Sequence, residues 1–193
     1  MAPKLLRMPV IYLAALGALV LMICSENNVV AEVPELQVIR DLCNRTESPD
    51  FCFSILSSDP DSRGSDFNEL RFNFLRLSRE KAERGVRFIS ALQKKTTDPL
   101  LKEILNYCSH RYERQVVRDT RTALDRYIDP DIPATLEALS WCIDAVEECE
   151  KAFKSPPYPA CEKAFKSSTY PSYIMRETNE LMKKYCRVAR QMF

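Results

Sequence analysis

Cysteine placement constrains this chain most, because eight cysteines lie in a sequence whose remaining pattern is helical. Two pairs stand out. Cys43 and Cys52 have eight residues between them. Cys108 and Cys149 have forty residues between them and lie on the apolar stripes of two different predicted helices. Helical bundles in reducing compartments rarely carry such pairs, because their thiols are kept reduced. The pattern therefore favours a helical bundle that passes through an oxidising, secretory compartment.

The N-terminal segment has the layout of a secretory signal peptide. Lys4 and Arg7 form a short basic region, and an uncharged apolar run extends from Pro9 to Cys24. Small residues follow, so we expect cleavage between residues 24 and 31, which leaves 32–193 as one domain. A retained signal anchor is the alternative, but the run is short for a membrane span of about 20 residues. We expect a secreted, extracellular protein that has no membrane segment after cleavage.

Charge and glycine content exclude several classes of function. The chain has 28 basic and 27 acidic residues, so its charge stays near zero after the signal is removed. This balance gives no electrostatic case for binding nucleic acid or an anionic membrane surface. Outside the signal only Gly64 and Gly85 are glycines. Phosphate-binding loops, Rossmann turns and nucleophile elbows all need glycine where the backbone turns sharply or approaches a ligand.

No enzyme, metal or cofactor site is visible in the sequence. His110 is the sole histidine, so a metal site built on several histidines is excluded and a catalytic triad would depend on this residue alone. His110 lies two positions after Cys108, about 200° around a helix, and should face solvent. The acidic residues fall mainly on polar helix faces. We interpret Phe72, Tyr107, Trp141 and Met182 as core or bundle-edge packing rather than as a cofactor pocket.

Apolar residues at three- and four-residue steps predict consecutive amphipathic helices. Ser65-Asp66 should cap the first long helix, and Asp98-Pro99 should begin the second. Four long helices with short connections predict an all-α, up-down-up-down four-helix bundle, preceded by a short helical hairpin. The expected helices span residues 32–44, 50–57, 66–95, 99–127, 134–154 and 172–190.

A tandem duplication covers residues 149–172. The segments 149–160 and 161–172 match at nine of twelve positions. A twelve-residue period is too short for a solenoid unit. Prolines at 156, 157 and 159 should end the preceding helix near Lys154, which makes the second copy an insertion before the last helix.

Cysteine spacing and flanking residues together resemble the plant inhibitors of invertase and pectin methylesterase. The resemblance covers about residues 33–190 and is carried by three motifs: Cys43-x8-Cys52-Phe53, Leu105-x2-Cys108-x3-Tyr112 and Asp144-Ala145-x3-Cys149-Glu150-x2-Phe153. It implies a helical hairpin closed by a disulfide, followed by the four-helix bundle. It also implies a cell-wall (apoplastic) inhibitor without a cofactor that binds a carbohydrate-modifying enzyme non-covalently, in a roughly one-to-one complex.

The same resemblance implies disulfides between Cys43 and Cys52 and between Cys108 and Cys149. Loss of Cys24 with the signal leaves seven cysteines, so one thiol has no partner within the chain. Cys142 and Cys149 lie two helical turns apart, about 10 Å, which is too far for a bond between them. Pairing of Cys142 with Cys186 would leave Cys161, the duplicated copy, as the free thiol. Because the copies are nearly identical, Cys161 is also an alternative partner for Cys108.

Two departures bear on the target enzyme. Invertase inhibitors often carry a Pro-Lys-Phe triplet before the third long helix, where this chain has the candidate target-contact loop Pro130, Asp131, Ile132 and Pro133. The Ser-Ala-Leu-Thr signature common in pectin methylesterase inhibitors is also absent, replaced by residues 139–143. Pectin methylesterase is marginally favoured because the triplet is missing, and invertase follows closely. A non-inhibitory secreted helical protein of the same fold, allergen-like or structural, is the competing hypothesis.

Asn44 begins the sequence Asn44-Arg45-Thr46, which matches the acceptor motif for N-linked glycosylation. The motif lies between Cys43 and Cys52, where a turn would expose the asparagine. We expect a glycoprotein modified at Asn44, although early closure of the adjacent disulfide could hinder transfer of the glycan.

Overall fold

Every regular element in the described part of the chain, residues 34–154 and 172–193 of a computed structural model, is helical. The described residues from Glu35 onward belong to one compact unit. The expected signal segment, Cys161 and the rest of the second copy up to residue 171 lie outside the described residues. No helix within the described ranges is both long enough and apolar enough to cross a membrane.

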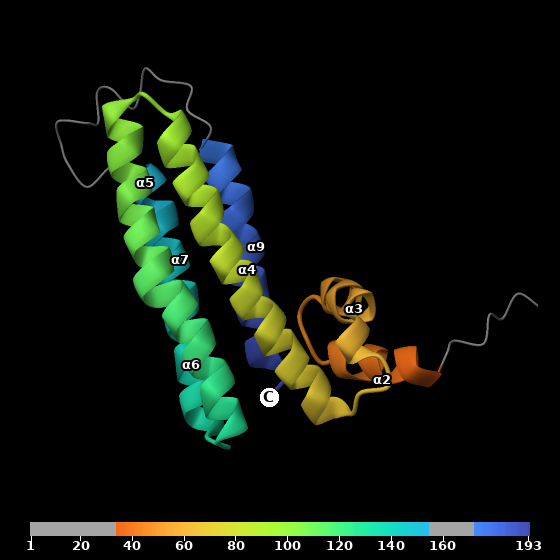
Figure 1. Ribbon diagram of the computed structural model, residues 1–193. Coiled ribbons are helices and arrows are strands. Elements are labelled where there is room, and N and C mark those ends of the chain that lie inside the picture. The colour runs from red at the N-terminus through yellow and green to blue at the C-terminus, as the bar shows by residue number, and fades with distance from the viewer. Residues whose placement is uncertain (1–33, 155–171) are drawn as a thin grey trace, which may run out of the picture. The chain divides into compact units, whose positions relative to one another are not determined.

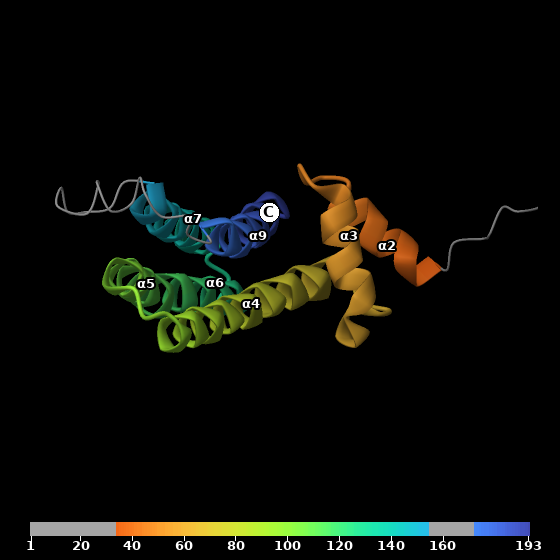
Figure 2. The same cartoon turned by 90° about the horizontal axis from the view of Figure 1, so that it is seen from above.

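Four helical rods form the expected up-down-up-down bundle (Figure 1). The rod α7 packs against α6 and α9, and α4 packs against α6 and α9 as well. Figure 2 shows α7 and α9 lying across from α4 and the α5–α6 rod. The bundle elements are α4 (Phe67–Lys95), α5 (Pro99–Arg111), the π-helical η2 (Tyr112–Val116), α6 (Val117–Ile128), α7 (Ile132–Lys154) and α9 (Ser172–Gln191).

A helical hairpin precedes the bundle, made of α2 (Pro34–Cys43), α3 (Pro49–Ser58) and the 3-10 turn η1 (Pro60–Ser62). Its attachment to α9 is aromatic and cationic. Phe51 of α3 meets the Tyr185 ring edge-on, with 5.2 Å between the ring centroids. Lys184 Nζ lies 4.6 Å from the centroid of the Phe51 ring. The predicted hairpin is therefore present and packs against both α4 and the last helix of the bundle.

Side-chain caps fix where the helices begin. The Asp66 carboxylate accepts hydrogen bonds from the backbone N–H groups of Asn68 and Glu69, and the Glu69 carboxylate accepts one from Asp66 N–H, which completes a capping box. Asp98 caps α5 with its Oδ1, which accepts a hydrogen bond from Leu101 N–H, and Pro99 lies in the first turn. The caps predicted from the sequence are confirmed.

The third long helix starts two residues earlier than predicted, at Ile132 rather than Ala134. Asp131 explains the difference, because its Oδ1 accepts a hydrogen bond from Ala134 N–H at 3.0 Å. Pro133 then lies in the first turn, where its missing N–H has no partner to lose.

The predicted helix over residues 99–127 is interrupted at η2, where Val117 N–H donates to the Tyr112 carbonyl in a π-helical pattern. Tyr112 is fully buried, and its hydroxyl donates to Asn179 Oδ1 at 2.8 Å. Burial raises the pKa of the Tyr112 hydroxyl, which keeps it protonated and able to donate. The π-helical segment therefore places a polar link between the second and fourth rods.

Three disulfides link helices within the part of the chain that the structure describes. Cys43–Cys52 closes the hairpin, with 5.4 Å between the Cα atoms. Cys108–Cys149 joins α5 to α7, and Cys142–Cys186 joins α7 to α9, with Cα separations of 4.9 Å and 6.6 Å. All six cysteines are buried. The disulfides therefore close the hairpin and link three of the four rods to one another.

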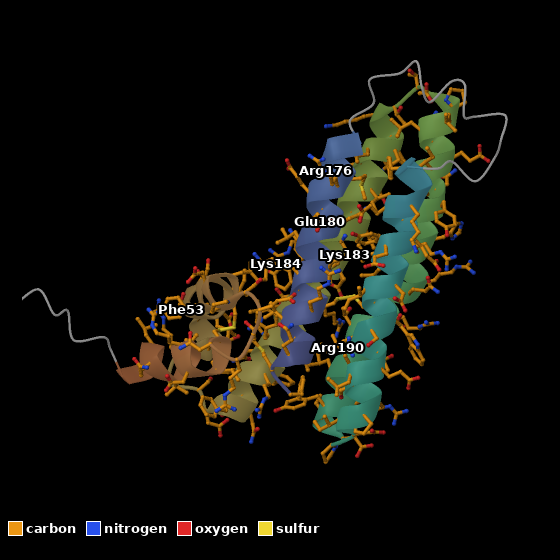
Figure 3. All side chains as sticks on the ribbon, turned by 180° about the vertical axis from the view of Figure 1, so that it is seen from behind. Phe53, Arg176, Glu180, Lys183, Lys184 and Arg190 are labelled. Carbon is orange, nitrogen blue, oxygen red and sulfur yellow. A yellow bond between two sulfur atoms is a disulfide. The ribbon has the colours of Figure 1, made fainter. Side chains whose placement is uncertain are left out.

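A buried ion pair also links α7 and α9. The Lys183 Nζ lies 2.6 Å from Glu150 Oε2 and 2.7 Å from Glu180 Oε1. Figure 3 shows Lys183 and Glu180 on α9. Burial alone would lower the pKa of the Lys183 ammonium, but the two carboxylates outweigh it, and the net shift is upward. Lys183 therefore stays charged in the folded protein.

Candidate functional site

His110 is exposed on α5, as the sequence predicted. Among residues 34–154 and 172–193, no group of three or more histidine, cysteine, aspartate or glutamate side chains is placed to hold a metal ion. The arrangements worth describing are therefore surfaces that could dock a macromolecule.

Two large apolar side chains are exposed among those the structure describes, and both belong to the α6–α7 hairpin. Ile128, the last residue of α6, is 65% exposed, and Trp141 of α7 is 49% exposed. By contrast, Met182 is buried, and Phe72 and Tyr107 pack against the core. Trp141 thus departs from the expected packing role. Exposed tryptophan and isoleucine on a rigid hairpin are candidates for contacts with a protein partner.

The candidate target-contact loop lies at the tip of this hairpin. Pro130 and Pro133 are exposed, whereas Asp131 and Ile132 are half-buried. The Asp131 carboxylate is already engaged as the cap of α7, and the Asp131 N–H donates to the Arg126 carbonyl at 3.0 Å. The exposed apolar contribution here comes from the neighbouring Ile128, which the sequence analysis did not single out.

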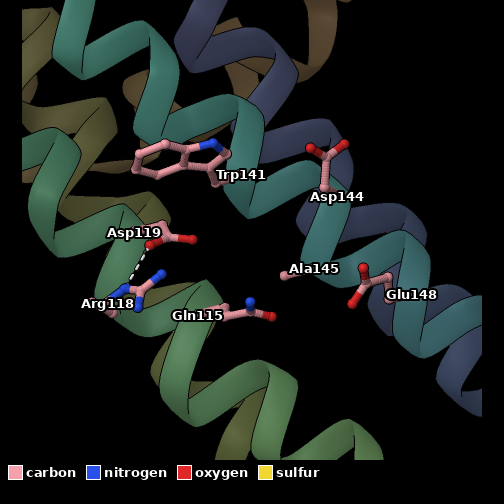
Figure 4. A pocket seen from close by; sticks show the side chains of 7 residues that line it. All are labelled: Gln115, Arg118, Asp119, Trp141, Asp144, Ala145 and Glu148. Carbon is pink, nitrogen blue, oxygen red and sulfur yellow. Dashed lines mark hydrogen bonds and ion pairs between the residues drawn. The ribbon is translucent and has the colours of Figure 1, made fainter.

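A groove of about 280 Å³ runs between α6 and α7 beside Trp141 (Figure 4). The groove is lined by Gln115, Arg118, Asp119, Trp141, Asp144, Ala145 and Glu148. Three of these side chains are carboxylates and one is a guanidinium. Arg111, from outside the lining, forms an ion pair with Glu148 at 2.7 Å. The groove is therefore acidic on balance.

Asp119 is the unusual member of the groove. Its side chain is 2% exposed, and its Oδ1 accepts a hydrogen bond from Arg118 Nε at 2.9 Å. Its Oδ2 is buried and has no hydrogen-bond partner among the described residues. Burial raises the pKa of the Asp119 carboxyl, and the neighbouring Arg118 opposes that shift. A buried carboxylate with one free oxygen is costly, so this residue invites a functional explanation.

Asp119 was not recognised from the sequence, although its position is informative. It lies three residues after Val116 and four before Ala123, on the apolar stripe of the second rod. A charged residue on such a stripe predicts a buried polar group.

The two ends of the glycosylation motif differ in exposure. Asn44 is exposed just after α2, whereas Thr46 is buried, and its hydroxyl donates to the Cys43 carbonyl at 2.8 Å. The asparagine that would carry a glycan is accessible.

The chain is similar to known plant inhibitor proteins. The family model described as plant invertase/pectin methylesterase inhibitor matches residues 37–192. Pectinesterase inhibitor 2 of Arabidopsis thaliana is 24% identical over 110 residues, which cover 54% of this chain and 64% of that protein. Cell wall / vacuolar inhibitor of fructosidase 1, also of Arabidopsis thaliana, is 29% identical over 108 residues, covering 56% of this chain and 46% of that protein. The matches thus span less than two thirds of either relative.

Solved structures show the same fold. The crystal structure of a mutant form of a pectin methylesterase inhibitor from Arabidopsis aligns with a TM-score of 0.61 at 18% identity, covering 83% of this chain and 95% of that one. A pectin methylesterase inhibitor from Arabidopsis thaliana aligns with a TM-score of 0.53 at 15% identity, covering 80% and 92%.

Proposed function

Because the chain belongs to the plant invertase/pectin methylesterase inhibitor family, we propose that it is an inhibitor that binds and blocks a cell-wall carbohydrate-modifying enzyme. The observation that carries this proposal is the match over residues 37–192, which takes in nearly all of the hairpin and all four rods. The protein is not itself an enzyme. It binds its target without covalent chemistry, one copy to one enzyme molecule, and covers the active-site cleft.

The physical design suits such a role. In the α6–α7 hairpin, α7 is tied to α5 by Cys108–Cys149 and to α9 by Cys142–Cys186. A braced surface loses little conformational freedom on docking, so more of the contact energy remains as affinity. Ile128 and Trp141 supply apolar area on that hairpin.

Pectin methylesterase is the target we favour marginally over invertase. The loop from Pro130 to Pro133 lacks the lysine and phenylalanine of the triplet credited with contacting invertase. One relative is a pectinesterase inhibitor and the other an inhibitor of fructosidase, so both enzymes belong in the test.

Secretion is part of the proposal. Residues 1–31 act as a signal peptide, residues 32–193 form the inhibitor domain, and the protein works in the cell wall. The buried disulfides support this location because they need an oxidising compartment to form.

Inhibition assays against purified pectin methylesterase and invertase, with a variant of the hairpin surface, test the proposal. We expect wild-type protein to inhibit one of the two enzymes and Ile128→Ser to weaken that inhibition about tenfold. Ala91→Ser, an exposed position on α4, is the matched control and should inhibit like wild type. Absence of inhibition of both enzymes by folded wild-type protein would favour the non-inhibitory alternative.

A further inference from the structure

We propose that the groove between α6 and α7 receives a basic side chain of the bound enzyme, an arginine or lysine whose cationic head lies between the Trp141 ring and the Asp119 carboxylate. The inference rests on the proposed function and specifies one contact within it.

The free oxygen of Asp119 is the first argument. Arg118 Nε donates a hydrogen bond to Oδ1 at 2.9 Å, whereas Oδ2 is buried and has no hydrogen-bond partner among the described residues. Figure 4 shows this carboxylate beneath the Trp141 ring, with its second oxygen directed into the groove. A buried carboxylate oxygen is best satisfied by a charged donor, and a guanidinium or ammonium group of a partner provides one.

Trp141 is the second argument. It is half-exposed, and apart from Ile128 no other large apolar side chain among the described residues is exposed. The face of an indole ring attracts cations, and the attraction grows when a partner excludes water. An aromatic ring beside a carboxylate is thus a site for a cation rather than for a purely apolar group.

Charge and size give the third argument. The lining has three carboxylates against one guanidinium, contributed by Arg118 and Asp119 from α6 and by Asp144 and Glu148 from α7. Arg111 pairs with Glu148, and Arg118 pairs with Oδ1 of Asp119. The Asp144 carboxylate and Oδ2 of Asp119 therefore remain to attract a cation. A volume of about 280 Å³ admits one side chain but not a helix or a polysaccharide. An anionic ligand, such as a uronate sugar, would be repelled.

The sole tryptophan makes the groove directly observable. The protein is labelled with 5-fluorotryptophan and titrated with N-acetylarginine amide, while fluorine NMR follows residue 141. N-acetylcitrulline amide, which has nearly the same shape but no charge, is the matched probe. We expect a saturable shift with the arginine probe only, and its loss in Asp119→Asn. An equal response to citrulline, or an unchanged response in Asp119→Asn, overturns the assignment.

The second arm uses the enzyme that the protein inhibits. Asp119→Asn and Trp141→Ala should each raise the inhibition constant about tenfold or more, and the fluorine signal should shift on complex formation. Glu103→Gln removes an exposed carboxylate on α5 outside the groove and should leave the constant unchanged. Melting temperatures establish that each variant is folded.

The two proposals fail in different ways. Undiminished inhibition by folded Asp119→Asn and Trp141→Ala, with no fluorine shift in the complex, overturns the inference and leaves the proposed function standing. If the folded wild-type protein inhibits neither enzyme, the proposed function is wrong, and the target enzyme cannot be what supplies the cation. In that case the arginine titration still decides whether the groove binds a cation.

Discussion

Gly85 of α4 lies so close to the Tyr112 ring of η2 that a Cβ at residue 85 would be 2.6 Å from Tyr112 Cε1. Real Cβ atoms do not approach a ring this closely, so glycine is required for the first and second rods to pack here. The Tyr112 ring has little room to yield, because it is fully buried and its hydroxyl is bonded to Asn179.

Gly85→Ala should destabilise the protein by about 1–3 kcal/mol, the usual range for overpacking a core. The sign of the change in unfolding free energy distinguishes the two effects, because helix propensity alone would make Gly85→Ala stabilising by about 1 kcal/mol. Urea denaturation followed by circular dichroism measures the change. A Tyr112→Leu background is the control: without the ring edge, Gly85→Ala should be neutral or stabilising. Equal destabilisation in both backgrounds would show that the ring is not the obstacle.

Asp119→Asn should change how stability depends on pH. Burial raises the pKa of the folded carboxyl above its ordinary value of 3.8. Its favourable contribution to stability is therefore present in acid, below 3.8, and is lost as the pH rises through the raised pKa. The Asn variant should match or exceed the wild type at neutral pH, and this advantage should shrink as the pH falls toward 3.8. Urea denaturation across a pH series checks this, and a difference that does not vary with pH would contradict it.

The two staples expected from the resemblance should differ in their effect on folding. Cys108–Cys149 spans a sequence separation of 41 residues and Cys43–Cys52 one of 9. Chain entropy assigns about 4 kcal/mol to the longer loop and about 3 kcal/mol to the shorter. We expect Cys108→Ser to lower the melting temperature and abolish inhibition, whereas Cys43→Ser should loosen only the hairpin.

Cys161 complicates that comparison, since a freed Cys149 could exchange with it. Both variants should therefore be made in a Cys161→Ser background and followed by thermal denaturation. If Cys43→Ser unfolds the bundle first, the hairpin is integral to the core, and the division between hairpin and bundle is wrong.

Asn44 should carry a glycan when the protein is secreted from plant cells. Digestion with a glycosidase should reduce the mass of the wild type, and Asn44→Gln should remove the difference. Thr46→Ser preserves both the acceptor motif and the buried hydroxyl that donates to Cys43, so it should remain glycosylated. An unchanged mass after digestion of the wild type would mean that the motif is unused.

The bundle was predictable because its determinants are local. Asp66 and Asp98 cap helices through backbone groups two or three residues away, and apolar spacing identified the buried faces. Asp119 and Trp141 were not recognised as a site, because the free oxygen and the exposed ring depend on how α6 meets α7. The π-helical turn at Tyr112 was also not predicted, since neither the packing of that ring against Gly85 nor its bond to Asn179 can be read from local spacing.

The central claim is that this protein inhibits a cell-wall enzyme by stoichiometric binding. Its most direct test is a titration of purified pectin methylesterase, held well above the expected dissociation constant, with the secreted protein, and a parallel titration of invertase. Activity of the target should fall linearly and end near one inhibitor per enzyme molecule. Full activity of both enzymes in the presence of excess folded protein would contradict the account.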